Sequence, residues 1–179
     1  MLNIILIAIV ISILVLLLLA AKQPADFKYS RSETMNASDK NIFEHLNDLH
    51  KVNAWSPWVK LDPNLVQTYS GEPYGVGAVY EWEGNSRVGK GRMTIVQSKP
   101  NTLVRTKLEF IKPIAATNVG EFKVEWDGKK STVYWSMEGK NAFIGKIMGL
   151  FMNMEKMIGD QFSQGLSDLT KIVEKKPKK

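Results

Sequence analysis

The chain opens with an apolar run of Leu, Ile, Val and Ala over residues 1–21, interrupted only by Asn3 and Ser12. An α-helix rises about 1.5 Å per residue, so about 20 such residues cross the roughly 30 Å hydrocarbon core of a bilayer. The run has no polar face, which argues against a helix buried in a globular core. It therefore predicts a single transmembrane anchor and restricts the fold of the remaining chain to a domain held beside a membrane.

A cleavable signal peptide is the alternative for this segment. Signal peptides combine a basic start, an apolar region of about 7–15 residues and small residues before the cleavage site. The segment Met1–Asn3 carries no basic side chain, and Leu19 occupies a position that would need a small residue if cleavage followed Ala21. We therefore favour a retained anchor and keep a cleaved signal as the alternative.

Basic residues indicate the orientation of the anchor. Lys22, Lys28 and Arg31 follow the span closely, and none precedes it. Lys and Arg near a span favour the cytoplasmic side, so we expect a single-pass protein with a cytoplasmic domain. The lysine-rich end at 175–179 is interpreted as a solvated terminus, although it would also suit an anionic inner leaflet.

The remaining chain has the size of one globular domain. We divide it into a stem over 22–26, a domain over 27–175 and a basic tail over 176–179. The net charge is +6, but acidic and basic residues alternate through the body and form no basic stripe, so we expect no nucleic-acid partner. The absence of cysteine excludes disulfides and thiolate metal sites. The oligomeric state is not predicted.

Alternating apolar and polar residues predict a series of β-strands in the body of the chain. In one of them, Tyr80 and Trp82 share a face, and Glu81 and Glu83 share the opposite face. The same alternation recurs in the others, which predicts an antiparallel sheet with one covered side and one solvated side. Hairpin turns are expected at 84–85 and 127–128. The expected strands are 27–35, 65–70, 78–83, 92–97, 103–111, 119–126 and 132–138.

Helical periodicity predicts the elements that cover this sheet. After a cap at 36–39, an apolar stripe from Ile42 to Leu49 indicates one short helix. From Ile147 to Val173, apolar residues recur at three- and four-residue steps, which is typical of a long amphipathic helix of roughly 25–30 residues. A break near Gly149 is an equally good interpretation, because glycine lowers helix stability.

Three sequence strings, in their order along the chain, carry a family resemblance. They are Trp-Ser-Pro-Trp at 55–58 with Asp-Pro at 62–63, the glycine- and aromatic-rich segment 75–85, and Gly-Arg-Met-Thr-Ile at 91–95. With the terminal helix, they resemble the SRPBCC superfamily, in its polyketide cyclase/dehydrase-like group related to START lipid-binding domains. The resemblance covers about residues 27–175. It implies an α+β helix-grip fold, in which a curved antiparallel sheet wraps around the C-terminal helix.

The resemblance further implies a cavity between sheet and helix for a hydrophobic small molecule or lipid. It transfers no catalytic residue and implies no cofactor. We therefore expect a membrane-anchored binding domain, with a cyclase- or dehydratase-like enzyme or a non-catalytic partner-binding protein as alternatives. The expected cavity-lining residues lie on the apolar faces: Tyr80, Trp82, Met93, Phe110, Trp135, Met154 and Phe162.

No residue pattern in the sequence predicts catalysis or a metal site. His45 and His50 fall on the same expected short helix, where five residues at about 100° each turn their side chains well apart, so they would not share one metal ion. Gly75-x-Gly77 and Gly89-x-Gly91 are followed by no helix, which makes turns or bulges a better explanation than phosphate binding. Function therefore depends on what the expected cavity contains.

Overall fold

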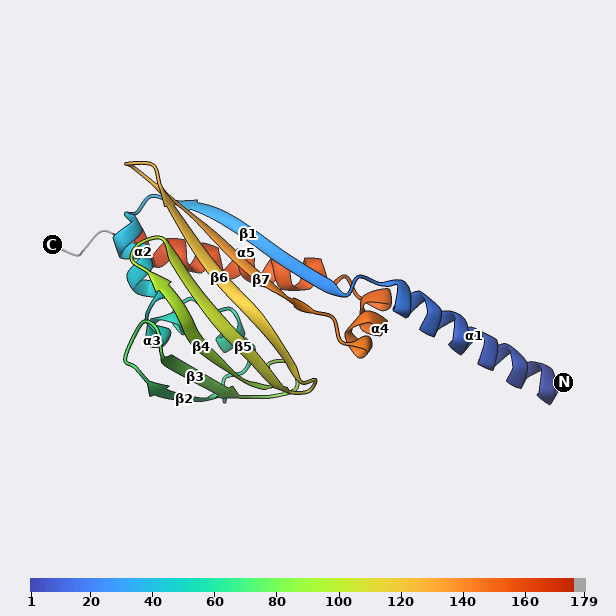
Figure 1. The fold of residues 1–179 in the computed structure, drawn as a ribbon. Helices are drawn as coiled ribbons and strands as arrows, with labels where there is room; N and C mark the ends of the chain where they lie inside the picture. The colour runs from blue at the N-terminus through green and yellow to red at the C-terminus, as the bar shows by residue number, and fades with distance from the viewer. Residues whose placement is uncertain (176–179) are drawn as a thin grey trace.

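The structure is a computed structural model and describes residues 1–175. It contains a seven-stranded antiparallel sheet in the order β1-β7-β6-β5-β4-β3-β2, with a long C-terminal helix against it (Figure 1). The predicted α+β class and helix-grip arrangement are confirmed. The basic tail at 176–179 lies outside the described residues. The strands are β1 (Asp26–Met35), β2 (Val66–Gly71), β3 (Ala78–Glu83), β4 (Lys90–Lys99), β5 (Leu103–Lys112), β6 (Ala116–Trp126) and β7 (Ser131–Lys140).

The convex face of the sheet carries the charged residues. Arg92 on β4 pairs with Glu81 on β3, and Lys90 pairs with Glu83 at 2.7 Å. These pairs join opposite charges on neighbouring strands and remain largely exposed to solvent, as the alternation predicted. Exposed ion pairs contribute little to stability, so this face serves solubility and strand register more than cohesion.

The helix α5 (Met154–Val173) crosses the concave face along β1 and β7. Two glycines permit the close approach: a Cβ at Gly159 would meet the Arg31 guanidinium, and one at Gly165 would lie 2.7 Å from the Trp135 ring. Arg31 donates a hydrogen bond to Glu155 at 2.7 Å, and Thr170 donates one to Glu33 at 3.0 Å. These polar contacts fix the helix over β1 near both of its ends.

Shorter helices cover the concave face at the end far from the N-terminus. They are α2 (Asp39–Leu46), α3 (Leu49–Val52) and the 3-10 turn η1 (Trp58–Leu61). Ser38 caps α2 by accepting a hydrogen bond from the Asn41 backbone N–H, and Asp48 caps α3 through the His50 N–H. The prediction of a single short helix was wrong, because Asp48 caps a second helix. His45 therefore lies on α2 and His50 on α3.

The long C-terminal helix is also divided in two, which matches the alternative with a break. The helix α4 (Phe143–Phe151) ends at Met152, whose backbone is extended, and Asn153 caps α5 by accepting a hydrogen bond from the Lys156 N–H. The break therefore lies three residues after Gly149, where a capping side chain can start the next helix.

The N-terminal helix α1 (Leu2–Lys22) projects from the domain next to α4 (Figure 1). Its segment Asn3–Ala21 has a mean hydropathy of 3.5 and is almost entirely exposed, so it meets the length and composition of a membrane span, as a signal sequence also does. The connection to β1 is ordered by hydrogen bonds from Asn141 to the carbonyls of Pro24 and Ala25. The helix is thus attached to the domain through a short and structured segment.

Asp168 joins η1 to α5 and gives the fold a pH dependence. Lys171, Lys60 and Gln164 all donate hydrogen bonds to its carboxylate, and these contacts lower its pKa to about 2. The unfolded chain, with an ordinary Asp pKa of about 4, binds this proton more readily than the folded chain does. We therefore expect stability to fall as pH drops from about 4 toward about 2.

Thermal melts of the full chain in detergent across this pH window test the role of Asp168. Asp168→Asn should flatten the acid side of the melting-temperature profile, whereas Asp160→Asn, on an exposed part of the same helix, should leave it steep. Equal acid slopes for wild type and Asp168→Asn would show that this cluster does not control the pH dependence.

Candidate functional site

The concave face is divided into a closed half and an open half. The closed half lies under α2, α3 and η1, where five aromatic rings pack against one another. Trp135 stacks on Phe162 with ring centroids 4.3 Å apart, and Trp55 meets Trp135 edge-to-face at 5.4 Å. Phe122 and Trp58 complete this aromatic cluster. Because these rings fill the space between sheet and helix, this half is a packed core.

The open half contains a row of side chains that crosses the sheet toward the α1 end. Its members occupy directly paired positions on neighbouring strands, from β1 across β7, β6, β5 and β4 to β3. Gly139 is the paired position on β7 and contributes no side chain. We call this set the cross-strand row: Phe27, Asn118, Leu108, Met93 and Tyr80. Its apolar members Phe27, Leu108 and Met93 are only partly buried, although they occupy inward positions. Within residues 1–175, no aromatic cluster like that of the closed half fills the space over these side chains.

A second, shorter row extends the open half toward the β3–β4 hairpin. The Trp82 indole lies across Gly91, where a Cβ would collide with the ring, and meets Phe110 edge-to-face with centroids 5.9 Å apart. Trp82 also donates a hydrogen bond from Nε1 to the carbonyl of Val88. Both rings are partly exposed, so they add aromatic surface without closing the face.

Asn118 is the polar member of the cross-strand row. The residue is 7% exposed, and its Oδ1 has no hydrogen-bond partner in the described part of the chain. Its Nδ2 lies 3.9 Å from the Met137 sulfur, which is a weak acceptor. An unpaired buried acceptor of this kind costs about 1–3 kcal/mol. The side chain fits because Gly139, its cross-strand neighbour, has no Cβ to occupy the same space.

Tyrosines supply the other polar atoms on this face. Burial raises the pKa of Tyr80 to about 12, with a further contribution from Tyr69, so its hydroxyl stays protonated at neutral pH. Burial also raises the pKa of Tyr69, whose hydroxyl meets the Asn53 amide. These groups can donate or accept hydrogen bonds, but they are poorly suited to proton transfer near neutral pH.

An open hollow of about 600 Å³ lies beside this face, between the start of β1, α4 and the start of α5. Phe27 and Tyr29 border it on the β1 side, and Leu150 and Met154 border it on the helical side. Phe27 also belongs to the cross-strand row, so the hollow and the open half adjoin. The hollow reaches Gln23 and Pro24, directly after α1.

The residues expected to line a cavity do not form one site. Trp135 and Phe162 belong to the closed aromatic cluster, whereas Met154 borders the hollow beside α4. The remaining four lie along the two rows of the open half, where Trp82, Met93 and Phe110 are partly exposed and Tyr80 is buried against Tyr69. Sequence reasoning thus identified inward-facing positions, and the assignment of a ligand to them stays a prediction.

Asn118 and Phe27 were missed as candidates. The strand expected at 119–126 in fact begins at Ala116, which brings Asn118 into the alternation as an inward residue. A polar residue at an inward position of a strand was the available signal. Phe27 was assigned to a strand, but its place beside Asn118 depends on the pairing of β1 with β7.

The described residues include no group of three His, Cys, Asp or Glu side chains placed to hold a metal ion. Burial, with a contribution from Lys51, lowers the pKa of His45, which keeps it neutral near pH 7. His50 stacks on Tyr69 and contacts Asp48. A smaller hollow of about 380 Å³ lies at the β3–β4 and β5–β6 turns, away from the concave face.

No protein-family model and no curated protein matches the chain. Solved structures do match it. Protein CV1439 from Chromobacterium violaceum has a TM-score of 0.60 at 14% identity, over 86% of this chain and 100% of that chain. The ginseng major latex-like protein 151 from Panax ginseng has a TM-score of 0.61 at 15% identity, over 85% of this chain and 100% of that chain.

A third similar structure is the di-domain ARO/CYC StfQ from the steffimycin biosynthetic pathway. Its TM-score is 0.59 at 8% identity, and the match covers 84% of this chain and 51% of that chain. At such low identities the similarity establishes a shared fold, which confirms the expected helix-grip architecture. The function of this chain must be argued from its own concave face.

We expect the Asn118→Leu variant to be more stable than the wild type. The substitution removes an unpaired buried acceptor and adds apolar surface beside Leu108, for a gain of about 1 kcal/mol. Thr106→Val is the matched control, because the Thr106 hydroxyl donates to the Gly120 carbonyl and its loss should cost about 1 kcal/mol. Denaturant unfolding of the full chain in detergent measures both, and a loss of stability in Asn118→Leu would show that the amide is satisfied.

Proposed function

We propose that this protein is a membrane-tethered binder of an apolar molecule that carries one hydrogen-bond donor. The ligand would lie on the open half of the concave face, against the cross-strand row, with its donor on Asn118. One observation carries the proposal: an inward-facing row of partly exposed apolar side chains surrounds a buried carboxamide without a partner.

The chemistry of this surface suits a hydrophobic ligand. Burying apolar area contributes on the order of 25 cal/mol per Å², before the cost of ordering the ligand is subtracted. Small-molecule sites usually combine a mainly apolar lining with a few polar groups that fix orientation. Here Leu108, Met93 and Phe27 would supply the apolar contact and Asn118 the single directional contact.

The N-terminal helix supports a membrane location for the binding domain. As a retained anchor, α1 would place its structured connection, Gln23 to Ala25, at the bilayer surface. The hollow beside the connection would then lie at the same surface and adjoin the open half through Phe27. A ligand dissolved in the bilayer would therefore have a short path to the cross-strand row.

A cyclase- or dehydratase-like enzyme is the second candidate, because one structural neighbour is named ARO/CYC from a biosynthetic pathway. Such chemistry would need an acid or base near the ligand. Among the described residues of the concave face, Arg31 and Glu33 are already engaged by α5, and the pKa of Tyr80 is raised to about 12. This arrangement supports binding better than proton transfer.

Native mass spectrometry of the full chain released from detergent tests ligand binding. We expect wild type to carry a co-purified or added hydrophobic adduct, with 1-hexadecanol as the added probe. Leu108→Arg should reduce adduct occupancy at least about tenfold, because it would place a charge, which is costly to desolvate, where the apolar ligand would lie. Lys107→Arg, the adjacent residue on the convex face, should retain it. A folded wild type that takes up neither a co-purified adduct nor 1-hexadecanol would refute the proposal.

A matched pair of probes tests the role of Asn118. 1-Hexadecanol carries an O–H donor, whereas methyl hexadecyl ether has a similar chain without one. One hydrogen bond of about 1–1.5 kcal/mol predicts a roughly 5–13-fold preference of the wild type for the alcohol. Asn118→Leu should lose this preference while still binding the ether, and an unchanged alcohol-to-ether ratio in this variant would exclude Asn118 as the anchor.

A further inference from the structure

The helix α4 presents an apolar surface that the domain leaves uncovered. None of its nine residues is buried, and Phe143, Ile144 and Phe151 are 49%, 46% and 72% exposed. Met152, which directly follows α4, is 39% exposed. We call this set of four residues the α4 surface. Large contiguous apolar patches on a protein surface mark interaction sites.

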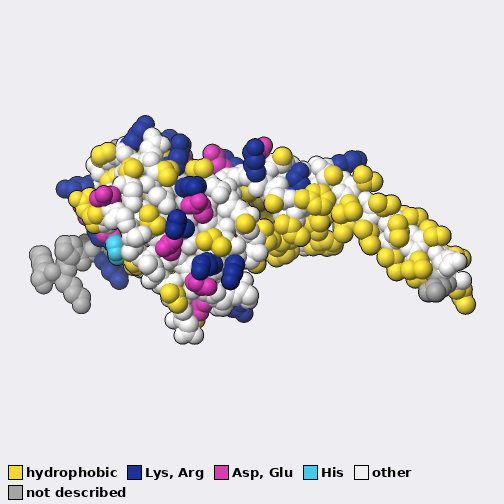
Figure 2. Space-filling model, turned by 60° about the horizontal axis from the view of Figure 1, so that its bottom comes forward, with side chains coloured by type: hydrophobic (Ala, Val, Ile, Leu, Met, Phe, Trp, Pro, Cys, Tyr) yellow, Lys and Arg dark blue, Asp and Glu magenta, His cyan; other side chains and the backbone are white. Residues whose placement is uncertain are grey.

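The position of α4 indicates what covers this surface. The helix lies beside the end of α1 that adjoins the domain, and Ala20 of α1 is completely buried there. Figure 2 shows hydrophobic side chains continuing from α1 onto the adjoining end of the domain, whereas Lys, Arg, Asp and Glu are interspersed over the part further from α1. The uncovered apolar helix α4 therefore adjoins the candidate membrane span.

The length of α1 sets the depth of α4. The apolar segment Asn3–Ala21 has 19 residues, which at about 1.5 Å per residue matches the roughly 30 Å hydrocarbon core without a surplus turn. The bilayer boundary would then lie close to Lys22. Because α4 packs against the last turns of α1, it cannot lie far above that boundary when α1 spans the bilayer.

The composition of α4 suits this depth. Its sequence contains no acidic residue, and its one charged residue is Lys146. A lysine can bury its aliphatic stem while its ammonium group reaches the lipid headgroups. Amphipathic helices at membrane interfaces insert their apolar face about 5–10 Å, and they carry their cationic residues on the polar side. The short helix thus has both the apolar side chains and the cationic residue that are typical of a helix at the membrane interface.

We infer that α4 is an interfacial membrane-docking helix and that the α4 surface inserts into the bilayer beside α1. The inference rests on the proposed anchor but is independent of ligand binding. It assigns the lipid bilayer as the partner of this surface. It also explains why a helix with no buried residue is inserted between β7 and α5: its partner is lipid. Docking would hold the hollow bordered by Leu150 and Met154 against the membrane.

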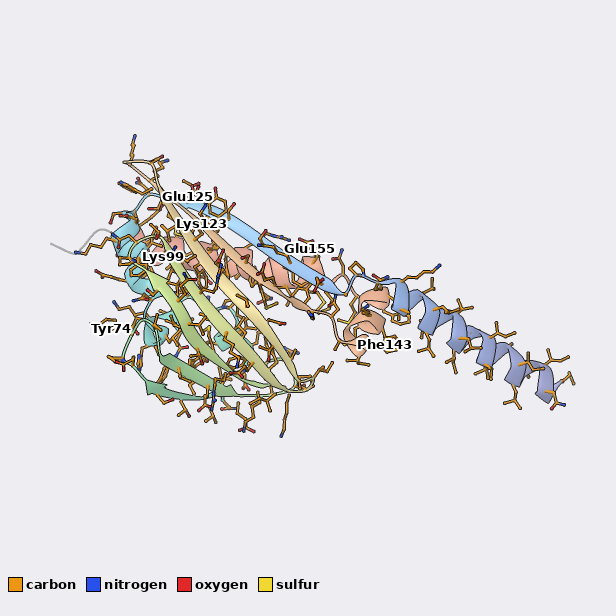
Figure 3. The ribbon with its side chains drawn as sticks, in the orientation of Figure 1. Tyr74, Lys99, Lys123, Glu125, Phe143 and Glu155 are labelled. Carbon is orange, nitrogen blue, oxygen red and sulfur yellow. The ribbon has the colours of Figure 1, made fainter. Side chains whose placement is uncertain are left out.

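Single-cysteine labelling tests this inference directly, because the chain contains no native cysteine. Phe151→Cys is labelled with the environment-sensitive fluorophore NBD in the full chain, reconstituted into phosphatidylcholine vesicles. Tyr74→Cys is the matched water-exposed control: Tyr74 is 66% exposed and lies at the far end of the domain from Phe143 and α4 (Figure 3). Leu14→Cys, in the middle of α1, reports whether the anchor itself is in the bilayer.

We expect the Phe151 label to emit at shorter wavelength than the Tyr74 label and to be quenched several-fold more strongly by nitroxide-labelled lipids. The Leu14 label should be quenched most by nitroxides placed deep in the acyl chain, and the Phe151 label by shallow ones. Thermal melts of the labelled variants confirm that each remains folded. This combination of results would support α4 as an interfacial helix.

Three results would overturn the inference. If the Phe151 label behaves like the Tyr74 label while the Leu14 label is quenched, α1 spans the membrane and α4 does not dock. If neither the Leu14 nor the Phe151 label is quenched, the anchor fails as well. If the Phe151 label is shielded only at high protein-to-lipid ratio and without lipid quenching, a second copy of the chain covers the α4 surface. The adduct measurements on Leu108→Arg are unaffected by any of these results.

Discussion

The apolar face of the curved sheet is larger than the area that the single long helix can cover. The rest of the structure depends on this mismatch in area. The α5 helix is 20 residues long, about 30 Å, and follows β1 and β7. It approaches closely at Gly159 and Gly165 and so leaves a gap over the strands from β6 to β3, where the shorter helices α2 and α3 supply only partial cover. The aromatic cluster fills the gap at one end. At the other end no aromatic cluster of this size lies among the described residues, and the cross-strand row stays partly exposed.

This division places the open half and the helix α1 at the same end of the molecule. The cross-strand row, the hollow beside α4 and the connection after α1 are successive neighbours, linked by Phe27 and Asn141. The convex face and the far end carry ion pairs and polar turns instead. An apolar ligand that entered from lipid would meet hydrophobic surface along this path, which is the physical basis for linking the tether to binding.

The strands could be predicted because alternation of apolar and polar residues is a local signal and turn residues separate the strands. The division of the concave face could not be predicted, because it depends on strand register. Asn118 meets Gly139 through the pairing of β6 with β7, and Leu108 through the pairing of β6 with β5. The helical break was ambiguous for a related reason. Gly149 weakens a helix, but the observed boundary is set by the Asn153 cap. The exposure of α4 follows from its packing mainly against α1 rather than against the sheet.

Asn118 and Gly139 together keep an unpaired carboxamide in the cross-strand row. A residue larger than glycine at position 139 would place a Cβ where the carboxamide now lies, 3.2 Å from the Phe27 ring. The observed pair instead leaves a buried acceptor unpaired, at a cost of about 1–3 kcal/mol in a fold whose net stability is typically only about 5–15 kcal/mol. Such a cost is recovered when a donor reaches Oδ1. A ligand that brings its own donor would therefore bind to this row more tightly than an equally apolar ligand without one.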